Sequence, residues 1–156
     1  MQDVIVIGIG NTIKSDDGAG VRALELLEGM VGEDVELVEG SVYCADMLPF
    51  LEGRRKAVFI DGIDAGEEPG ALYRFSADEV SESKGMALSV HDFGVYELLK
   101  AAALLGQCPG EVVMFCVQVK DTSFGDRLSP EVQAALPRLC GLVVEEVGGR
   151  PAVTST

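Results

Sequence analysis

Three side chains from separate parts of this sequence, Asp17, Asp61 and His91, are suited to holding one divalent metal ion. Asp17 lies in a polar loop after the first apolar run, Asp61 directly follows the third run, and His91 is the only histidine of the chain. Carboxylate and imidazole donors suit zinc, nickel, iron or manganese rather than copper(I). No two of them have the i, i+4 spacing of a helical metalloprotease motif. A shared site therefore has to be assembled by the fold.

The segment that would position Asp17 runs from Asp3 to Val21 and has the pattern strand, glycine turn, loop, helix. Val4–Ile7 is a run of β-branched residues, which predicts a strand buried on both faces. Gly8–Asn11 is a glycine-rich turn that permits positive φ angles and close backbone approach. The loop that follows carries Asp16 and Asp17 at the carboxyl end of the strand, where open α/β sheets bind their ligands.

Three interpretations of this segment compete. A dinucleotide fingerprint would need a glycine where the chain has Ile13, and Asp16 and Asp17 would repel a pyrophosphate. In the second interpretation, one of the two aspartates only caps the following helix. We favour the third, a cation site built on carboxylate oxygens, since it explains why both acids follow a glycine turn at a strand tip.

Asp61 and His91 also have simpler interpretations. Asp61 could be a turn residue that bonds its own backbone, but parallel strands would place it at the same edge of the sheet as Asp17. His91 could be a capping or surface residue. Because it lies at a helix start, however, the helix dipole disfavours the imidazolium, and the neutral ring is the form that binds metals.

Composition bounds the class of protein. The 156 residues are 47% hydrophobic with a mean hydropathy of +0.25, which predicts one domain, residues 1–148, and a disordered tail, residues 149–156. A net charge of −14 opposes binding to nucleic acid and to anionic membranes. The sequence shows neither a run of about 18 apolar residues nor a signal-peptide pattern, so we expect a cytoplasmic protein. The four scattered cysteines are expected to be buried hydrophobes rather than disulfides or zinc ligands.

Strand and helix patterns alternate along the chain, which predicts an α/β fold with a sheet covered on both faces. A polar connection is expected over residues 76–88. The expected strands are Val4–Ile7, Val35–Val38, Ala57–Ile60, Ala71–Phe75 at a sheet edge, and Glu111–Val119; the expected helices are Gly18–Met30, Ala45–Leu51, Val95–Leu105 and Pro130–Val147, with Ser129 as the cap of the last.

Four blocks of the sequence resemble the NiFe-hydrogenase maturation endopeptidases, and the resemblance runs from Asp3 to about Val147. The most specific block is GIGNTIKSDDGAGVRALELL, in which an acidic residue precedes a glycine and the first helix. SVHDFGVYELL, with its histidine followed three residues later by glycine, is the second most specific. The other two blocks are VFIDGID and LSPEV.

The resemblance implies a peptidase that removes the C-terminal extension from the precursor of a NiFe-hydrogenase large subunit after nickel insertion, with the bound nickel as the recognition mark. It places the family's catalytic and metal-contacting residues on Asp17, Asp61 and His91, and makes Asp16 a weaker candidate. The nickel would come with the precursor, although another divalent metal could occupy the isolated protein. The implied fold is a three-layer α/β/α sandwich, phosphorylase/hydrolase-like, with a twisted, mostly parallel sheet of about five strands. We expect a monomer.

Two loops depart from the family pattern. The family often has aspartate-glycine-glycine-threonine where this chain has Glu39–Val42, and a proline is common within Gln118–Asp121. Both loops would border the cleft and could set which precursor is accepted. Two other functions remain open: a non-catalytic chaperone that binds nickel or the precursor, and a phosphate- or nucleoside-handling enzyme, for which Lys14 is the one base near the glycines.

Overall fold

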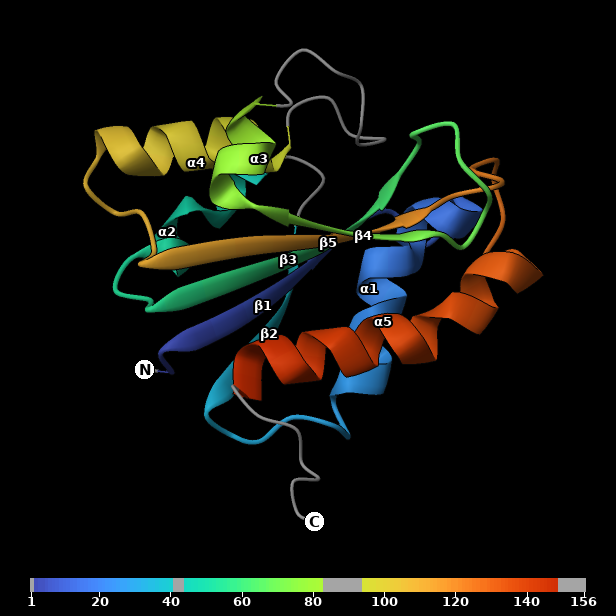
Figure 1. Ribbon diagram of the computed structural model, residues 1–156, viewed down its shortest axis with the longest axis horizontal. Coiled ribbons are helices and arrows are strands. Elements are labelled where there is room, and N and C mark those ends of the chain that lie inside the picture. The colour runs from blue at the N-terminus through green and yellow to red at the C-terminus, as the bar shows by residue number, and fades with distance from the viewer. Residues whose placement is uncertain (1, 41–43, 83–93, 149–156) are drawn as a thin grey trace.

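The computed structural model describes residues 2–40, 44–82 and 94–148. His91 and the tail, residues 149–156, lie outside the described residues. A five-stranded sheet with the order β2-β1-β3-β5-β4 forms the centre of the molecule (Figure 1). Neighbouring strands are parallel except β4, which pairs antiparallel with β5 at the edge. The strands are β1 (Val4–Ile9), β2 (Val35–Gly40), β3 (Lys56–Ile63), β4 (Leu72–Ser76) and β5 (Glu111–Gln118).

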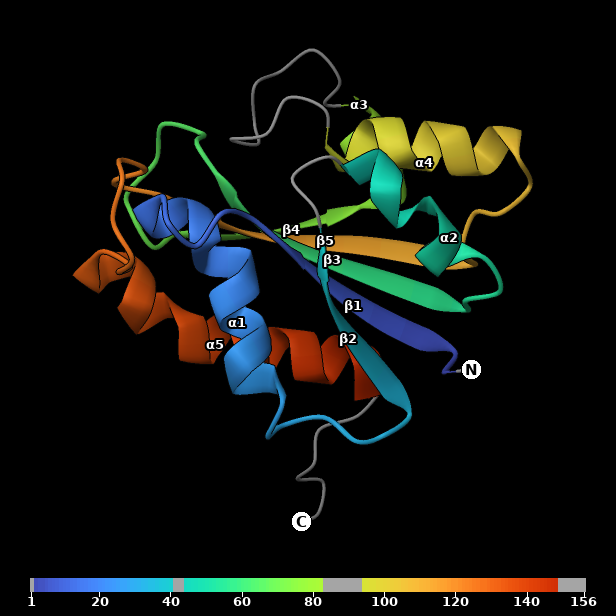
Figure 2. The same ribbon diagram turned by 180° about the vertical axis from the view of Figure 1, so that it is seen from behind.

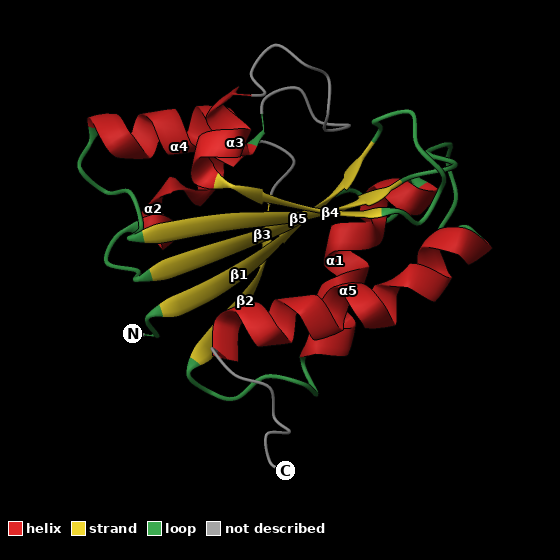
Figure 3. Cartoon of the chain, in the orientation of Figure 1, coloured by secondary structure: helices red, strands yellow, loops and turns green. Residues whose placement is uncertain are grey.

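Helices cover both faces of the sheet, so the predicted three-layer α/β/α sandwich is confirmed (Figure 3). The helices α1 (Ala19–Leu27) and α5 (Pro130–Gly148) lie on one face. The short α2 (Leu48–Leu51), α3 (Ala77–Glu82) and α4 (Val95–Leu104) lie on the other. Two 3-10 turns, η1 (Ser15–Gly18) and η2 (Cys44–Met47), precede α1 and α2.

Each face of the sheet packs into its own hydrophobic core. Alternate residues of β3 divide between the two: Val58 and Ile60 pack with α1 and α5, while Ala57 and Phe59 pack with α2 and α4. Strands buried on both faces are continuous apolar runs, which is why the sequence predicts them well. No helix in the described part of the chain has the length and apolar character needed to cross a membrane.

Helix α1 lies unusually close to the sheet because glycine permits it. A Cβ atom at Gly20 would lie 2.3 Å from the carbonyl oxygen of Ile60. This close approach brings the start of α1, and η1 before it, onto the carboxyl ends of β1 and β3.

Several elements differ from the sequence predictions. The first three strands extend two or three residues further toward their carboxyl ends than expected, because each keeps its partner in the ladder; β3, for example, pairs with β5 as far as Ile63 and Gln118. Helix α3 occupies part of the predicted polar connection. Of the cysteines whose side chains the structure describes, Cys116 and Cys140 are buried as expected, Cys108 is exposed, and all three are free thiols.

Strand order creates one point where the chain changes direction across the sheet. From β1 the chain crosses to β2 on one side, and then to β3 on the other side of β1. The connections that follow β1 and β3 therefore lead to opposite sides of the sheet, and the strand order reverses between these two strands. Open α/β sheets bind ligands at such a topological switch point.

Candidate functional site

Asp17 lies at the carboxyl end of β1, in η1. The turn before it needs glycine: Gly10 has a φ of +148°, and a Cβ atom there would lie 2.0 Å from the carbonyl oxygen of Asp17. The Asp17 side chain is only 5% exposed. Its Oδ2 accepts a hydrogen bond from the Asn11 N–H at 3.1 Å. A buried carboxylate is thus anchored to the glycine turn that precedes it.

Asp61 lies within β3 rather than after it. Its side chain is 1% exposed, and its Oδ1 accepts a hydrogen bond from the Gly62 N–H at 2.7 Å. It pairs in register with Cys116 of β5. Because side chains alternate along a strand, Asp61 lies on the same face as Phe59, the face that α2 and α4 cover.

The fold brings Asp17 and Asp61 to the same end of the sheet, where the parallel strands β1 and β3 finish, at the switch point between them. The end of β3 packs directly against η1: a Cβ atom at Gly62 would lie 3.5 Å from the carbonyl oxygen of Asp16. In Figures 1 and 2 the blue segment that follows β1 lies at the end of the sheet opposite the N-terminus. The expectation that parallel strands place both acids on the same side of the sheet, at its carboxyl end, is confirmed.

His91 precedes α4, which starts at Val95, by a few residues and lies outside the described residues. Val95 is buried against the face of the sheet that carries Asp61. Helix α4 starts at the end of the sheet where β1 and β3 finish and runs back toward the N-terminal end (Figure 1). The role of His91 therefore stays a prediction.

Asp16 has a structural role that the sequence analysis did not anticipate. It is fully buried, with an exposed fraction of 0%. Its carboxylate accepts four hydrogen bonds: from the N–H groups of Lys120 (2.8 Å) and Asp121 (3.0 Å), and from the N–H (2.7 Å) and hydroxyl (2.8 Å) of Ser129. Asp16 thus joins the loop after β1 to the loop after β5. No spacing in the sequence signals this contact across more than 100 residues.

The interpretation of Asp16 or Asp17 as a helix cap is wrong. The N-cap of α1 is Gly18, and no side chain forms a capping hydrogen bond there. Both aspartates belong to η1, before the N-cap; Asp16 accepts hydrogen bonds from the distant loop after β5, and Asp17 accepts one from the glycine turn.

The cysteine beside Asp61 is not suited to nucleophilic catalysis. Burial, and then the negative charge of Asp61, raise the pKa of the Cys116 thiol well above its ordinary value. Burial likewise raises the pKa of Cys140 to about 11. Because the thiolate is the nucleophile, both thiols are inert near neutral pH. The chemistry at this edge rests on carboxylates.

Two buried carboxylates can accept a proton from water or donate oxygen ligands to a cation. Within residues 2–40, 44–82 and 94–148, no group of three or more histidine, cysteine, aspartate or glutamate side chains is placed to hold a metal. Asp17 and Asp61 thus supply at most two donors from the described part of the chain, and the predicted third donor, His91, lies outside it.

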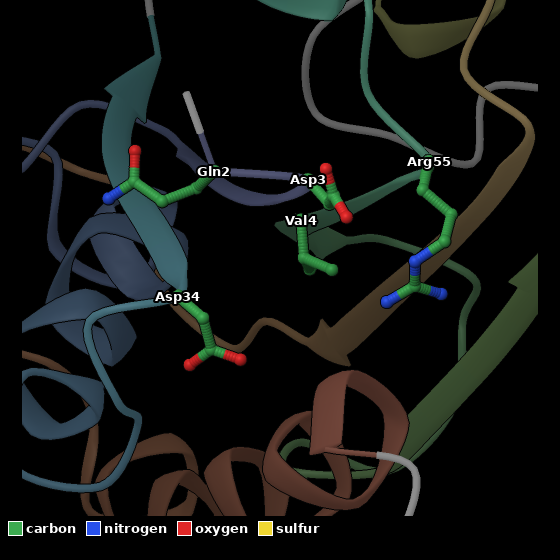
Figure 4. A pocket seen from close by; sticks show the side chains of 5 residues that line it. All are labelled: Gln2, Asp3, Val4, Asp34 and Arg55. Atoms are coloured by element: carbon green, nitrogen blue, oxygen red, sulfur yellow. The ribbon is translucent and has the colours of Figure 1, made fainter.

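A separate pocket lies at the opposite end of the sheet, where the strands begin. It has a volume of about 430 Å³ and is lined by Gln2, Asp3, Val4, Asp34 and Arg55 (Figure 4). Acidic and basic side chains both line it, and it is distant from the switch point. It contributes nothing to the site at Asp17 and Asp61.

Known proteins resemble this chain along most of its length. The family model for hydrogenase maturation proteases matches residues 21–146. The hydrogenase expression/formation protein HupD from Bradyrhizobium diazoefficiens is 35% identical over 134 residues, which are 83% of this chain and 70% of HupD.

Solved structures of such proteins share the fold. The hydrogenase maturating endopeptidase HybD from E. coli superposes with a TM-score of 0.86 at 24% identity, over 96% of this chain and 93% of HybD. The NiFe-hydrogenase maturation protease HybD from Thermococcus kodakarensis gives a TM-score of 0.77 at 26% identity, over 94% of this chain and 99% of that protein.

Proposed function

Because the chain belongs to the hydrogenase maturation protease family, we propose that it removes the C-terminal extension from the large-subunit precursor of a NiFe hydrogenase once nickel has been inserted. Membership of the family makes the chain a peptidase with a role in hydrogenase maturation. The proposal adds the substrate, the position of the cut and its dependence on nickel. It also keeps the cytoplasm as the compartment and a monomer as the active form.

One observation carries the proposal. Two carboxylates that are almost fully buried, Asp17 and Asp61, come from separate segments and lie at the carboxyl ends of β1 and β3, at the switch point of the sheet. Burying a carboxylate costs free energy, which a fold sustains only where specific partners stabilise the charge. Backbone N–H groups of Asn11 and Gly62 provide part of that stabilisation. Carboxylates buried at this free-energy cost, at the end of the sheet where ligands bind, support a functional role for both acids.

In the proposed mechanism, nickel held by the precursor is part of the substrate. Asp17, Asp61 and His91 contact that ion and so place the scissile peptide bond over the edge of the sheet. One of the two carboxylates accepts a proton as water attacks the carbonyl carbon, and the proton passes to the departing amine when the C–N bond breaks. The net reaction is hydrolysis, in which one water molecule adds across one peptide bond.

This arrangement would also restrict the enzyme to its substrate. Two carboxylates and one imidazole leave a metal coordination sphere incomplete, so the precursor must provide the remaining ligands. A protein without the ion would lack the positioning contact, and positioning accounts for a large share of catalytic rate. General proteolysis is therefore not expected.

The test is cleavage of purified nickel-loaded precursor, followed as a loss of mass at its C-terminus. We expect His91→Ala to abolish processing and Asp61→Asn to lower its rate about 100-fold or more, because each removes a group that contacts the ion or the water. Asp61→Asn keeps the size of the side chain and an oxygen that can accept from Gly62. Circular dichroism should show that both variants remain folded.

Asp64→Asn is the matched control. Asp64 lies three residues further along the same connection, is exposed, and accepts a hydrogen bond from Gln118 at 3.3 Å. It should process the precursor at nearly the wild-type rate. Normal trimming by His91→Ala and Asp61→Asn would refute the site, whereas a stable complex without cleavage by the wild-type chain would indicate a chaperone.

A further inference from the structure

Ser15 has an unusual backbone conformation directly before the two aspartates of η1. Its φ is +52°, and no other residue except glycine has a positive φ within residues 2–40, 44–82 and 94–148. A side chain in this left-handed region costs free energy, because its Cβ atom lies too close to the following carbonyl oxygen. Such a conformation persists only where the surrounding structure determines it.

The loop after β5 holds Ser15 in this conformation. The Ser15 N–H donates to the carbonyl of Gly125 at 2.9 Å, and the Ser15 hydroxyl donates to the carbonyl of Ser123 at 2.8 Å. The N–H of Gly125 in turn donates to the carbonyl of Ile13 at 3.0 Å. Figures 1 and 2 both show the loop after β1 and the loop after β5 together at this end of the molecule. Ser15 is 8% exposed, so water competes little for these hydrogen bonds.

The contact between the two loops is also close. A Cβ atom at Gly125 would lie 2.8 Å from the Ser15 hydroxyl oxygen, so a side chain there would displace the hydroxyl. Asp16 continues the contact, because its N–H donates to the carbonyl of Asp121 at 2.9 Å in addition to the bonds that its carboxylate accepts. The start of η1 is therefore docked on the loop after β5 through backbone and side chain alike.

The backbone at Ser15 determines where Asp17 lies. The N–H of Asp17 donates to the carbonyl of Lys14 at 3.1 Å, which closes a turn with Ser15 as its second residue. The carbonyl and the carboxylate of Asp17 both accept from the N–H of Asn11, at 3.2 and 3.1 Å. A change of φ at Ser15 would rotate the chain that follows it and so move the Asp17 carboxylate relative to Asp61.

We propose that Ser15 is a positioning residue, which in its strained conformation holds the Asp17 carboxylate in the place that peptide hydrolysis requires. The inference rests on the proposed function, since it concerns the same carboxylate. Ser15 does not touch the reacting atoms and acts through Asp17. A misplacement of about 1 Å costs on the order of 100-fold in rate, so a residue that only sets position has a measurable effect.

The test compares two substitutions whose stabilities and activities should rank in opposite orders. Ser15→Gly removes the hydroxyl bond and also the strain, so its melting temperature should stay within about 3 °C of wild type. Ser15→Ala removes the bond and keeps the strain, so it should melt about 3 to 6 °C lower. For cleavage of nickel-loaded precursor, kcat should fall about tenfold in Ser15→Gly, which frees the backbone, and about threefold in Ser15→Ala, with KM within about twofold of wild type.

Amide hydrogen exchange tests the inference without cleavage. Because the Asn11 N–H donates to Asp17, its exchange rate reports how firmly Asp17 is held. This amide should exchange about tenfold faster in Ser15→Gly than in the wild-type chain. A role of Ser15 in global stability alone would leave the exchange of Asn11 unchanged in a variant that melts near the wild-type temperature.

Ser76→Ala is the matched control. The Ser76 hydroxyl accepts a hydrogen bond from the Glu79 N–H at 3.2 Å, and Ser76 pairs with Val113 near the start of β5, at the opposite end of the sheet. Its replacement should lower the melting temperature by about 3 °C and leave kcat and the exchange of Asn11 at wild-type values.

Several results would overturn the inference. These are wild-type kcat in Ser15→Gly, activities that rank in the order of the stabilities, a rise in KM alone, and an unchanged exchange rate of Asn11. If the wild-type chain does not cleave the precursor, the proposed function fails, and the exchange of Asn11 still decides whether Ser15 holds Asp17 in place.

Discussion

The two ends of the sheet both bury charged groups, but they satisfy them by different means. At the end where the strands begin, bases are buried and carboxylates neutralise them. At the end where the strands finish, carboxylates are buried, and the hydrogen bonds described for Asp16 come from neutral donors. No buried side-chain nitrogen or oxygen in the described residues lacks a partner at either end.

Ion pairs tie elements together where the strands begin. Arg54 is 7% exposed and contacts Glu36 at 2.6 Å, and it also donates to the carbonyl of Gln2 at 2.7 Å. Lys56 is 7% exposed and contacts Glu146 of α5 at 2.5 Å. Opposite charges at this distance cancel each other's field, so the pairs satisfy buried charges and leave little net charge for chemistry.

The Asp16 carboxylate at the other end is held by amide and hydroxyl donors rather than by a base. Amide and hydroxyl hydrogen bonds stabilise an ionised carboxylate without cancelling its charge. Asp16 uses this stabilisation to join two loops, and the same segment then presents Asp17 at the switch point. The comparison teaches that burial of a charge alone does not identify a site; the type of partner and the place in the sheet do.

The largest expected effect is on stability at the site end. Asp16→Ala should lower the free energy of unfolding by about 4 kcal/mol, since it leaves several buried donors of the loop after β5 without an acceptor. Denaturant unfolding followed by circular dichroism measures this. Processing by the folded fraction should also fall, because η1 carries Asp17.

Two further variants, with smaller expected losses of stability, serve as comparisons for Asp16→Ala. Ser129→Ala removes one of the donors to Asp16 and should cost about 1 kcal/mol. Asp126→Ala alters an exposed aspartate in the neighbouring loop and should change stability by less than about 0.5 kcal/mol. An Asp16→Ala protein as stable as Asp126→Ala would contradict the joining role of Asp16.

Removing a base at the opposite end should destabilise the fold and leave catalysis intact. Lys56→Ala should lower the free energy of unfolding by about 3 kcal/mol, because Glu146 loses its closest cation while it stays largely buried. Processing per folded molecule should match wild type, since the change lies far from the switch point. A fall in kcat beyond about twofold at full folding would show that the two ends are coupled.

Much of the fold could be predicted from local patterns. The buried strands are apolar runs and the helix α5 starts at Pro130 as its sequence indicates, so pattern and structure agree. The placement of Asp17 and Asp61 at one edge also followed, because parallel strands leave little choice. The length of β3 did not follow, since its pairing with β5 depends on a partner about 50 residues away.

Contacts between distant loops could not be predicted. Asp16 was ranked below Asp17 as a ligand, and nothing in the sequence linked it to Ser129, whose hydroxyl was expected only to cap α5. Nor did spacing reveal that the loop after β1 pairs with the loop after β5 at Lys14 and Gly125, because a single backbone bridge has no periodic signal. The sequence therefore predicts which residues reach the edge, whereas the structure is needed to show which of them hold the loops together.

The smallest expected effect is a pH dependence at the end where the strands begin. Burial raises the pKa of Glu146, but hydrogen bonds from Arg74 and Lys56 outweigh it and lower the pKa below the ordinary 4.5. A carboxyl group with a lowered folded-state pKa stabilises the fold above its unfolded pKa and loses that contribution as the pH falls through the folded value. The difference in unfolding free energy between wild type and Glu146→Gln should therefore be about 1 kcal/mol at pH 6 and shrink below about pH 4.5. Thermal denaturation across this range measures it, with Glu52→Gln as an exposed control, and a difference that stayed constant would mean that α5 is held at this end by packing alone.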